Sequence, residues 1–361
     1  MSCFFQAAIN RRTLFTVLFV IVPAVSLTYG KTEVPVFLFS GQSNMVGISS
    51  VNGLSSDQKE TISNIMINVS ADCDASKKGK WLPLGPGFGN TATNFGPELF
   101  FGRTLADSMP DQKIAFIKNA VNGAPLGTTS GYLPPSSNNG TAGNNYSSMM
   151  THIEEAMRTF NDAFDTSEYT PRWAGFVWLQ GETDALQGGS MADNYRTNLE
   201  NLISDIREVC ETPDLPVILP LISKSSYWVE ADKIRAADVA LRESLENIDT
   251  IETKHLNLLQ DNMHYDAPGQ MEIGYWSAIR WLGLEYEYRD PVPVARHRFT
   301  RPIEHSLVRR DAFPIHFFDL SGRRRTVSRN ATERESVIPS LLIGKSTDPF
   351  HASTLKTVII R

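Results

Sequence analysis

The chain has 361 residues, of which 41% are hydrophobic and 20% charged, so it can bury a large core and wholesale disorder is excluded. The net charge of −6 is unevenly distributed. Residues 291–361 hold 13 Lys and Arg against 6 Asp and Glu, which makes them net +7. With the two arginines near the N-terminus also set aside, residues 31–290 carry a net −15. An acidic body of this kind argues against a nucleic-acid partner.

The N-terminus has the pattern of a secretory signal peptide. Arg11 and Arg12 precede an apolar run at 14–27, and small residues follow at 28–30. We therefore predict a signal peptide over residues 1–30 and a secreted, extracellular or cell-surface protein. The alternative is an N-terminal anchor, but the run is short for a membrane span. The rest of the chain has no other long apolar run, so no membrane span is expected in the mature chain.

Apolar runs that predict strands alternate with longer amphipathic patterns that predict helices. The strands are expected at 34–39, 114–117, 173–179 and 217–222, and the helices at 97–108, 149–160, 191–210 and 227–247. This alternation predicts a three-layer α/β/α domain over residues 31–290 with a central parallel sheet. Residues 128–148, rich in Ser, Asn and Gly, are expected to form a long exposed loop.

Polar, glycine-containing loops follow three of the predicted strands. They span 40–47, 119–127 and 180–189. Parallel sheets of this class place functional groups at the carboxyl ends of their strands, so these loops are the expected site.

The pattern changes after Asp290. Prolines at 291, 293 and 302 indicate a linker, and short strand-like runs follow at 315–320, 337–343 and 355–360. Residues 291–361 are therefore predicted to form a linker and a small, basic, β-rich C-terminal domain.

Ser43 is the candidate nucleophile for ester hydrolysis. It follows Gly41 on a predicted strand-to-helix turn, which would expose its hydroxyl. The alternative is an ordinary turn in which Ser43 caps a helix. The Gly-x-Ser-x-Gly pattern of other hydrolases is absent at this position.

His264 is the candidate base by elimination among the histidines of the body. His152 falls within a helical pattern, and His255 is expected to enter a strand. Asp261 precedes His264 by three residues, a spacing at which one turn places a carboxylate against an imidazole. The alternative is a coincidental pair of loop residues.

The loop after the third strand supplies further candidates. Gln180 could donate its amide to an oxyanion, and Glu182 or Asp184 could be a second acid that holds the loop. The alternative is a polar loop with Asp184 capping a turn. Cys73 and Cys210 are expected to be structural, whether paired or not, and no metal or cofactor is expected because the histidines are not spaced as ligands.

Four sequence blocks carry a resemblance to a known family. They are Gly41-Gln42-Ser43-Asn44-Met45, Gly96-Pro97-Glu98, Trp178-Leu179-Gln180-Gly181-Glu182-Thr183-Asp184 and Asp261-Asn262-Met263-His264-Tyr265-Asp266-Ala267-Pro268-Gly269-Gln270. In this order, over about residues 33–286, they resemble the sialate O-acetylesterase/acetylxylan esterase group, carbohydrate esterase family 6, of the SGNH hydrolase superfamily.

The resemblance implies an SGNH, flavodoxin-like α/β/α fold and a triad of Ser43, His264 and Asp261. It also implies an oxyanion hole formed by the Ser43 amide, the Gly123 amide and the Gln180 side chain. The glycine block departs from the usual Gly-Gly-Thr, since Asn122-Gly123-Ala124 stands here. The same blocks make Gln42, Asn44 and Glu182 candidate supporting residues.

The tail resembles, more loosely, a C-terminal secretion or sorting domain of Bacteroidetes and Fibrobacter type. Phe318-Asp319-Leu320-Ser321-Gly322-Arg323 and the closing Lys356-Thr357-Val358-Ile359-Ile360-Arg361 carry this likeness. It implies secretion machinery as a partner. A carbohydrate-binding module is the alternative, but the tail contains no Trp or Tyr to stack on a sugar.

Together these observations predict a secreted serine esterase that deacetylates carbohydrate, with acetylated xylan as the expected substrate. The alternatives are a sialate O-acetylesterase and a non-catalytic carbohydrate-binding protein with a degenerate esterase fold. A lipase-like or thioesterase SGNH enzyme would need an apolar acyl groove, for which the sequence has no apolar loop insert.

Overall fold

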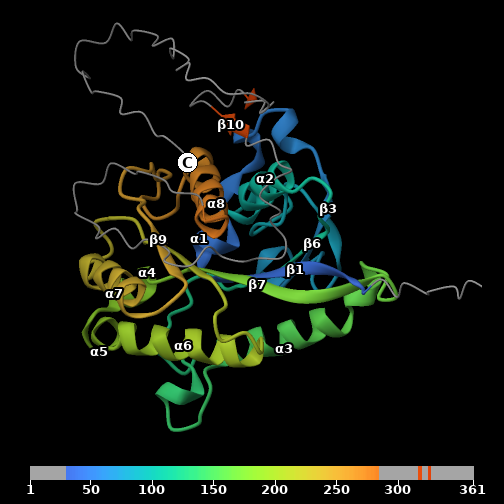
Figure 1. Ribbon diagram of the computed structural model, residues 1–361. Coiled ribbons are helices and arrows are strands. Elements are labelled where there is room, and N and C mark those ends of the chain that lie inside the picture. Colours follow the sequence, from blue (N-terminus) through green and yellow to red (C-terminus); the bar gives the residue numbers. More distant parts are fainter. Residues whose placement is uncertain (1–29, 284–315, 319–323, 327–361) are drawn as a thin grey trace, which may run out of the picture. The chain divides into compact units, whose positions relative to one another are not determined.

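The computed structural model describes residues 30–283 and two short strands at 316–318 and 324–326 (Figure 1). Residues 30–283 form a central seven-stranded sheet of order β4-β3-β6-β1-β7-β8-β9. Its strands are β1 (Thr32–Gly41), β3 (Ile62–Val69), β4 (Leu82–Leu84), β6 (Ile114–Ala120), β7 (Tyr169–Leu179), β8 (Val217–Pro220) and β9 (Ile248–Ile251). Every neighbouring pair is parallel except β3 and β4, and β2 (Ser49–Ser50) pairs separately with β5 (Asn94–Phe95).

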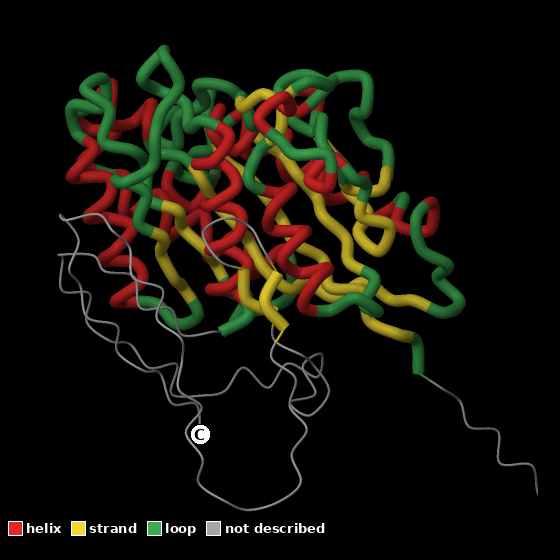
Figure 2. Tube along the Cα trace, turned by 90° about the horizontal axis from the view of Figure 1, so that it is seen from above, coloured by secondary structure: helices red, strands yellow, loops and turns green. Residues whose placement is uncertain are grey.

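Helices cover both faces of the sheet, as the ribbon and the tube view show (Figures 1 and 2). The helices are α1 (Ser43–Val46), α2 (Glu98–Ser108), α3 (Asn144–Arg158), α4 (Glu182–Gln187), α5 (Gly189–Asp193), α6 (Tyr195–Val209), α7 (Ala231–Ser244) and α8 (Ala267–Trp281). Buried side chains of α2 and α8 share one hydrophobic cluster, and those of α3, α6 and α7 share the other. The predicted three-layer α/β/α fold with a mostly parallel sheet is confirmed.

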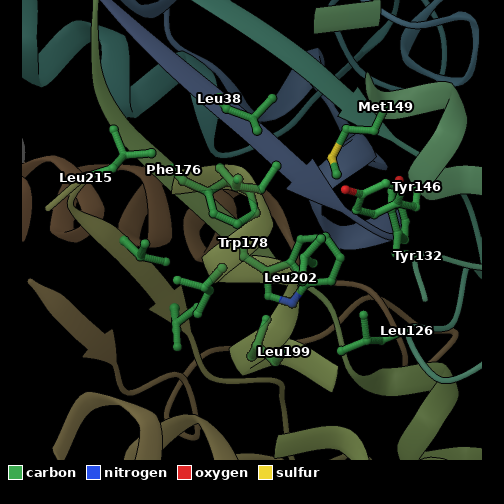
Figure 3. Packing of buried hydrophobic residues seen from close by; sticks show 14 of the residues in the cluster. Leu38, Leu126, Tyr132, Tyr146, Met149, Phe176, Trp178, Leu199, Leu202 and Leu215 are labelled. Carbon is green, nitrogen blue, oxygen red and sulfur yellow. The ribbon is translucent and has the colours of Figure 1, made fainter. Parts of the chain in front are cut away.

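Strand β1 shows how the sequence builds two cores at once. Val36 and Leu38 belong to the cluster under α3, α6 and α7, whereas Phe37 and Phe39 belong to the cluster under α2 and α8. Alternate side chains of a strand point to opposite faces, so a continuous apolar run is what a sheet covered on both sides requires. Figure 3 shows the first cluster, in which Leu38 lies near Phe176, its register partner on β7.

Several predicted boundaries differ from the structure. The predicted helix 191–210 is two helices, α5 and α6, that meet at Asn194, and the predicted helix 227–247 begins only at Ala231. The expectation of an exposed loop over 128–148 is wrong in part, because Tyr132 is fully buried and α3 begins at Asn144. His255 does not enter a strand, since β9 ends four residues earlier at Ile251.

The described strands beyond residue 283 belong to a second unit and stand by themselves. β10 (His316–Phe318) pairs antiparallel with β11 (Arg324–Thr326), and β10 falls within the predicted strand 315–320. Residues 1–29 of the signal peptide predicted over 1–30, the predicted linker and the predicted strands 337–343 and 355–360 lie outside the described residues. None of the helices that the structure describes is both long enough and apolar enough to cross a membrane.

Candidate active site

The nucleophile candidate lies in a tight turn at the carboxyl end of β1. Gly41 ends the strand with φ +146°, and a Cβ at this position would lie 2.0 Å from the carbonyl oxygen of Leu179. Only glycine fits this combination of backbone angle and close approach. Gln42 then caps the four-residue helix α1, whose first residue is the half-buried Ser43.

The structure brings Ser43, His264 and Asp261 into one hydrogen-bonded chain. The Ser43 Oγ lies 2.9 Å from His264 Nε2, and His264 Nδ1 lies 2.7 Å from Asp261 Oδ2. Ser43 comes from the turn after β1, whereas the other two come from the loop between β9 and α8. The spacing and the order of contacts are those of a nucleophile, a base and an orienting carboxylate.

Asp261 is held as a carboxylate in a fixed position. Partial burial opposes its ionisation, but the His264 ring and the backbone N–H groups of His264 and Met263 donate hydrogen bonds to it and keep its pKa below the usual value. A carboxylate in this place favours the His264 tautomer with hydrogen on Nδ1, which leaves Nε2 free to accept a proton from Ser43.

Asn44 joins the nucleophile turn to the loop of the base. Its side-chain nitrogen donates to Glu182 Oε1 at 2.7 Å and to the Met263 carbonyl at 3.3 Å, while its oxygen accepts from the Tyr265 N–H at 3.1 Å. Met263 and Tyr265 flank His264 in sequence, so Asn44 sets the position of the base relative to the adjacent Ser43.

Two backbone N–H groups in the loops after the neighbouring strands β1 and β6 have no hydrogen-bond acceptor among the described residues. Within residues 30–283, neither the Ser43 N–H nor the Gly123 N–H donates a hydrogen bond. Gly123 is exposed with φ +66° in the loop after β6, and its carbonyl accepts from Thr183 Oγ1 at 3.1 Å. Unpaired N–H groups on neighbouring loops are the kind of donor that stabilises an oxyanion.

The Gln180 amide is already occupied. Its nitrogen lies 2.7 Å from Asp184 Oδ2, 3.1 Å from the Ala124 carbonyl and 3.2 Å from Gln42 Oε1, and the residue is buried. To donate to an oxyanion, this amide would have to release one of these acceptors. A direct role for Gln180 therefore stays a prediction, whereas Gln42 forms part of the network that holds its side chain.

The two acids of the loop after β7, Glu182 and Asp184, have different hydrogen-bond partners. Glu182 bonds Asn44 and does not take the place of Asp261 beside His264. Asp184 accepts from the N–H groups of Leu126 and Gly127, both at 2.8 Å, so it anchors the loop that carries Gly123. Burial raises the pKa of both carboxyls in spite of these hydrogen bonds.

Residues 33–282 match the family model described as carbohydrate esterase, sialic acid-specific acetylesterase. The chain belongs to this family of carbohydrate esterases. A probable carbohydrate esterase of Arabidopsis thaliana is 32% identical over 106 residues, a match that spans 29% of this chain and only 39% of that relative. Membership supports a hydrolase that acts on carbohydrate esters.

Solved structures share the fold of this esterase domain. A crystal structure of an Arabidopsis thaliana protein has a TM-score of 0.55 at 21% identity, and the match covers 70% of this chain and 99% of that one. A carbohydrate acetylesterase from Xanthomonas citri gives 0.50 at 14% identity, with 68% and 55% of the two chains covered. The structure of NanS gives 0.50 at 13% identity, with 70% and 97% covered.

A buried ion pair supports the nucleophile turn of this carbohydrate esterase. Lys118 Nζ lies 2.7 Å from Glu98 Oε2, and both side chains are 0% exposed. The same nitrogen donates to the carbonyls of Val46, at the end of α1, and of Phe88. In the sequence, Glu98 stood out only as part of the Gly96-Pro97-Glu98 motif, and Lys118 was not among the predicted site residues. A lysine inside the apolar strand β6 was the available signal, because a buried charge needs a partner.

The other histidines of the esterase domain have structural contacts. His152 is buried, its Nε2 lies 2.9 Å from Asn68 Oδ1, and burial together with Lys78 lowers its pKa to about 4. His255 lies 2.6 Å from Glu272 on the surface. Neither is hydrogen-bonded to Ser43, so the choice of His264 by elimination agrees with the geometry.

Other features of the esterase domain lie apart from the triad. Cys73 and Cys210 are both buried and free. No group of three His, Cys, Asp or Glu side chains that could hold a metal ion occurs among the described residues. A hollow of about 460 Å³, lined by residues that include Lys59 and Phe88, is lined by none of the triad residues.

Proposed function

We propose that this protein is a secreted serine esterase that removes O-acetyl groups from carbohydrate, with acetylated xylan as its substrate class. The observation that carries the proposal is the hydrogen-bonded chain from Ser43 through His264 to Asp261. The N–H groups of Ser43 and Gly123, which donate no hydrogen bond within the described part of the chain, are available as oxyanion donors and add to this support. Membership of the carbohydrate esterase family supports the carbohydrate part of the proposal.

The first half of the reaction forms an acetyl-enzyme. His264 Nε2 takes the proton of Ser43 as Oγ attacks the acetyl carbonyl, and Asp261 stabilises the imidazolium that results. The N–H groups of Ser43 and Gly123 donate to the oxygen that gains negative charge. When the tetrahedral intermediate collapses, its bond to the sugar oxygen breaks, and this oxygen takes the proton from His264.

The second half repeats the steps with water. His264 removes a proton from a water molecule as its oxygen attacks the acetyl carbon. Collapse of this second intermediate breaks the bond to Ser43 Oγ, which regains a proton from His264, and acetate leaves.

The two ends of the sequence and the family model bear on the substrate and the location. The predicted signal peptide over 1–30 and the sorting-like tail over 291–361 favour an exported enzyme that acts on plant polysaccharide. A sialate O-acetylesterase is the second candidate, favoured by the description of the matching family model. A non-catalytic binding protein would have no need of the complete triad.

Acetate release tests the proposal. The wild-type protein should release acetate from acetylated xylan faster than from O-acetylsialic acid. Ser43→Ala should abolish both activities, because loss of the nucleophile in a working triad costs on the order of a million-fold in turnover. Ser63→Ala, at an exposed serine of β3, is the matched control and should keep full activity. Full activity of Ser43→Ala would refute the nucleophile, and a preference for O-acetylsialic acid would refute the substrate.

A further inference from the structure

The loop after β8 lies at the same edge of the sheet as the candidate active site. Strand β8 pairs in parallel with β7 on one side and with β9 on the other. The loop after β7 carries Gln180, Glu182 and Asp184, and the loop after β9 carries His264. Because the carboxyl ends of parallel strands share one edge, the β8 loop, residues 221–230, lies between these two loops. It supplies no residue to the triad itself.

This loop exposes large apolar side chains that the core does not use. Tyr227 is 50% exposed and Val229 is 74% exposed. Leu186 of the neighbouring helix α4 is 45% exposed. Among the described residues, the one other large hydrophobic side chain that is exposed is Val209, at the end of α6. Three of these four side chains therefore belong to two adjoining segments, and an apolar surface concentrated in this way is typical of a binding site.

Hydrogen bonds tie the β8 loop to the active-site loops on both sides. The Glu230 N–H donates to the Ala185 carbonyl of α4 at 3.0 Å. On the other side, the Asn262 side chain donates to Ser226 Oγ at 3.2 Å. Asn262 directly follows Asp261, so Tyr227 is adjacent in sequence to Ser226, which contacts the loop that carries Asp261 and His264.

Tyr227 is part of an ordered turn. Its N–H donates to Ser225 Oγ at 3.2 Å, and its ring centroid lies 6.2 Å from that of Trp228, with the rings inclined at 55°. Trp228 is buried, and its Nε1 donates to Ser223 Oγ at 3.1 Å. The exposed ring therefore has a fixed support, which lowers the entropy cost of binding a ligand against it.

We infer that Tyr227 forms a stacking subsite for a pyranose ring of the glycan, next to the acetylated sugar at Ser43. The inference rests on the proposed function and adds a binding residue to it. One face of a pyranose is made of C–H groups that pack on an aromatic ring, and its edge carries hydroxyls. Ser226 and Asn262 present polar groups beside Tyr227, which suits a sugar edge better than a fatty acyl chain.

Substrate length provides the test. Tyr227→Ala should lower kcat/KM on an acetylated xylo-oligosaccharide about two- to twelvefold, through KM, since an aromatic contact of about 0.5–1.5 kcal/mol corresponds to such a factor. The kcat/KM of this variant on p-nitrophenyl acetate, which contains no pyranose ring to stack on Tyr227, should not change. Tyr227→Phe should keep the wild-type values. Val209→Ala, at an exposed side chain of α6, is the matched control and should leave kcat/KM unchanged on both substrates.

A binding measurement separates this inference from the proposed function. Calorimetric titration of the Ser43→Ala protein with an unacetylated xylo-oligosaccharide should show binding, and adding Tyr227→Ala should weaken it by a similar factor. If the wild-type enzyme hydrolyses the acetylated oligosaccharide and Tyr227→Ala leaves both KM and this affinity unchanged, the subsite is refuted while the proposed function stands. Tyr227-dependent binding without hydrolysis by the wild type would support the subsite and refute the proposed function. If Tyr227→Ala lowers kcat/KM equally on both ester substrates, Tyr227 is a structural residue of the site and the inference is overturned.

Discussion

Replacing Asn44 by alanine removes three side-chain hydrogen bonds that cross between the loops of the site. They join Asn44 to Glu182, to the Met263 carbonyl and to the Tyr265 N–H. At about 1 kcal/mol net for each bond, we expect Asn44→Ala to lower the free energy of unfolding by about 3 kcal/mol. In a domain of this size, that loss corresponds to a fall in Tm of roughly 6–12 °C.

The same change should impair turnover, because Asn44 fixes the loop of His264 against the turn of Ser43. A displacement of about 1 Å between reacting groups costs on the order of a hundredfold in rate. We therefore expect kcat on p-nitrophenyl acetate to fall about a hundredfold at a temperature where circular dichroism shows the variant folded. Thermal unfolding and steady-state kinetics on one preparation measure both effects.

Asn122→Ala is the matched control for Asn44→Ala. Asn122 is exposed, and its side chain donates one hydrogen bond, to Asn90. Its loss should change the free energy of unfolding by less than about 0.5 kcal/mol. The reasoning fails if Asn44→Ala melts within about 2 °C of the parent, since the three bonds would then contribute far less than the expected 1 kcal/mol each. It also fails if the variant keeps the parent kcat, because the bonds would then not position His264.

Two further predictions concern the charges around the nucleophile. Asp261→Asn should lower kcat about ten-thousandfold with little change in fold. The new amide would donate to His264 Nδ1 and leave the ring hydrogen on Nε2, the atom that must accept the proton of Ser43. A pH–rate profile that keeps the parent kcat would contradict this prediction. Lys118→Met should cost about 3–5 kcal/mol in urea unfolding, since it leaves Glu98 buried without its cation, and the double variant Lys118→Met/Glu98→Gln should recover part of that loss. A double variant no more stable than Lys118→Met would show that the unpaired charge is not the cause.

The sequence predicted the layers of the fold well because the central strands are continuous apolar runs. Strand β1 is buried on both faces, and a short apolar run that ends at a polar, glycine-containing loop is typical of a strand in a covered parallel sheet. Strand β3 escaped prediction because Asn64 and Asn68 interrupt its apolar pattern. The helix α8 was missed for a related reason, since it begins with Ala267-Pro268-Gly269, which has the composition of a turn.

The contacts of the candidate site could be predicted from the sequence where they are local, but not where they join distant segments. Asp261 and His264 are three residues apart, and their spacing alone indicated the contact that the structure shows. The bonds from Asn44 to the loop of His264 and the pairing of Lys118 with Glu98 depend on strand order, which local patterns do not contain. The amide of Gln180 was expected to be free because the sequence does not show that Asp184 accepts from it.

The hydrogen bond between Ser43 and His264 joins residues 221 positions apart in the chain. Its two ends lie on loops that follow β1, at the centre of the sheet, and β9, at its edge, so β7 and β8 must be in place before the two side chains meet. Closing so long a loop is slow and entropically costly, and the contact forms only when most of the sheet has assembled. Recovery of esterase activity during refolding should therefore be one of the last events, later than the return of helical structure. A proteolytic cut that separates β1 from β9 would leave neither fragment with both the nucleophile and its base.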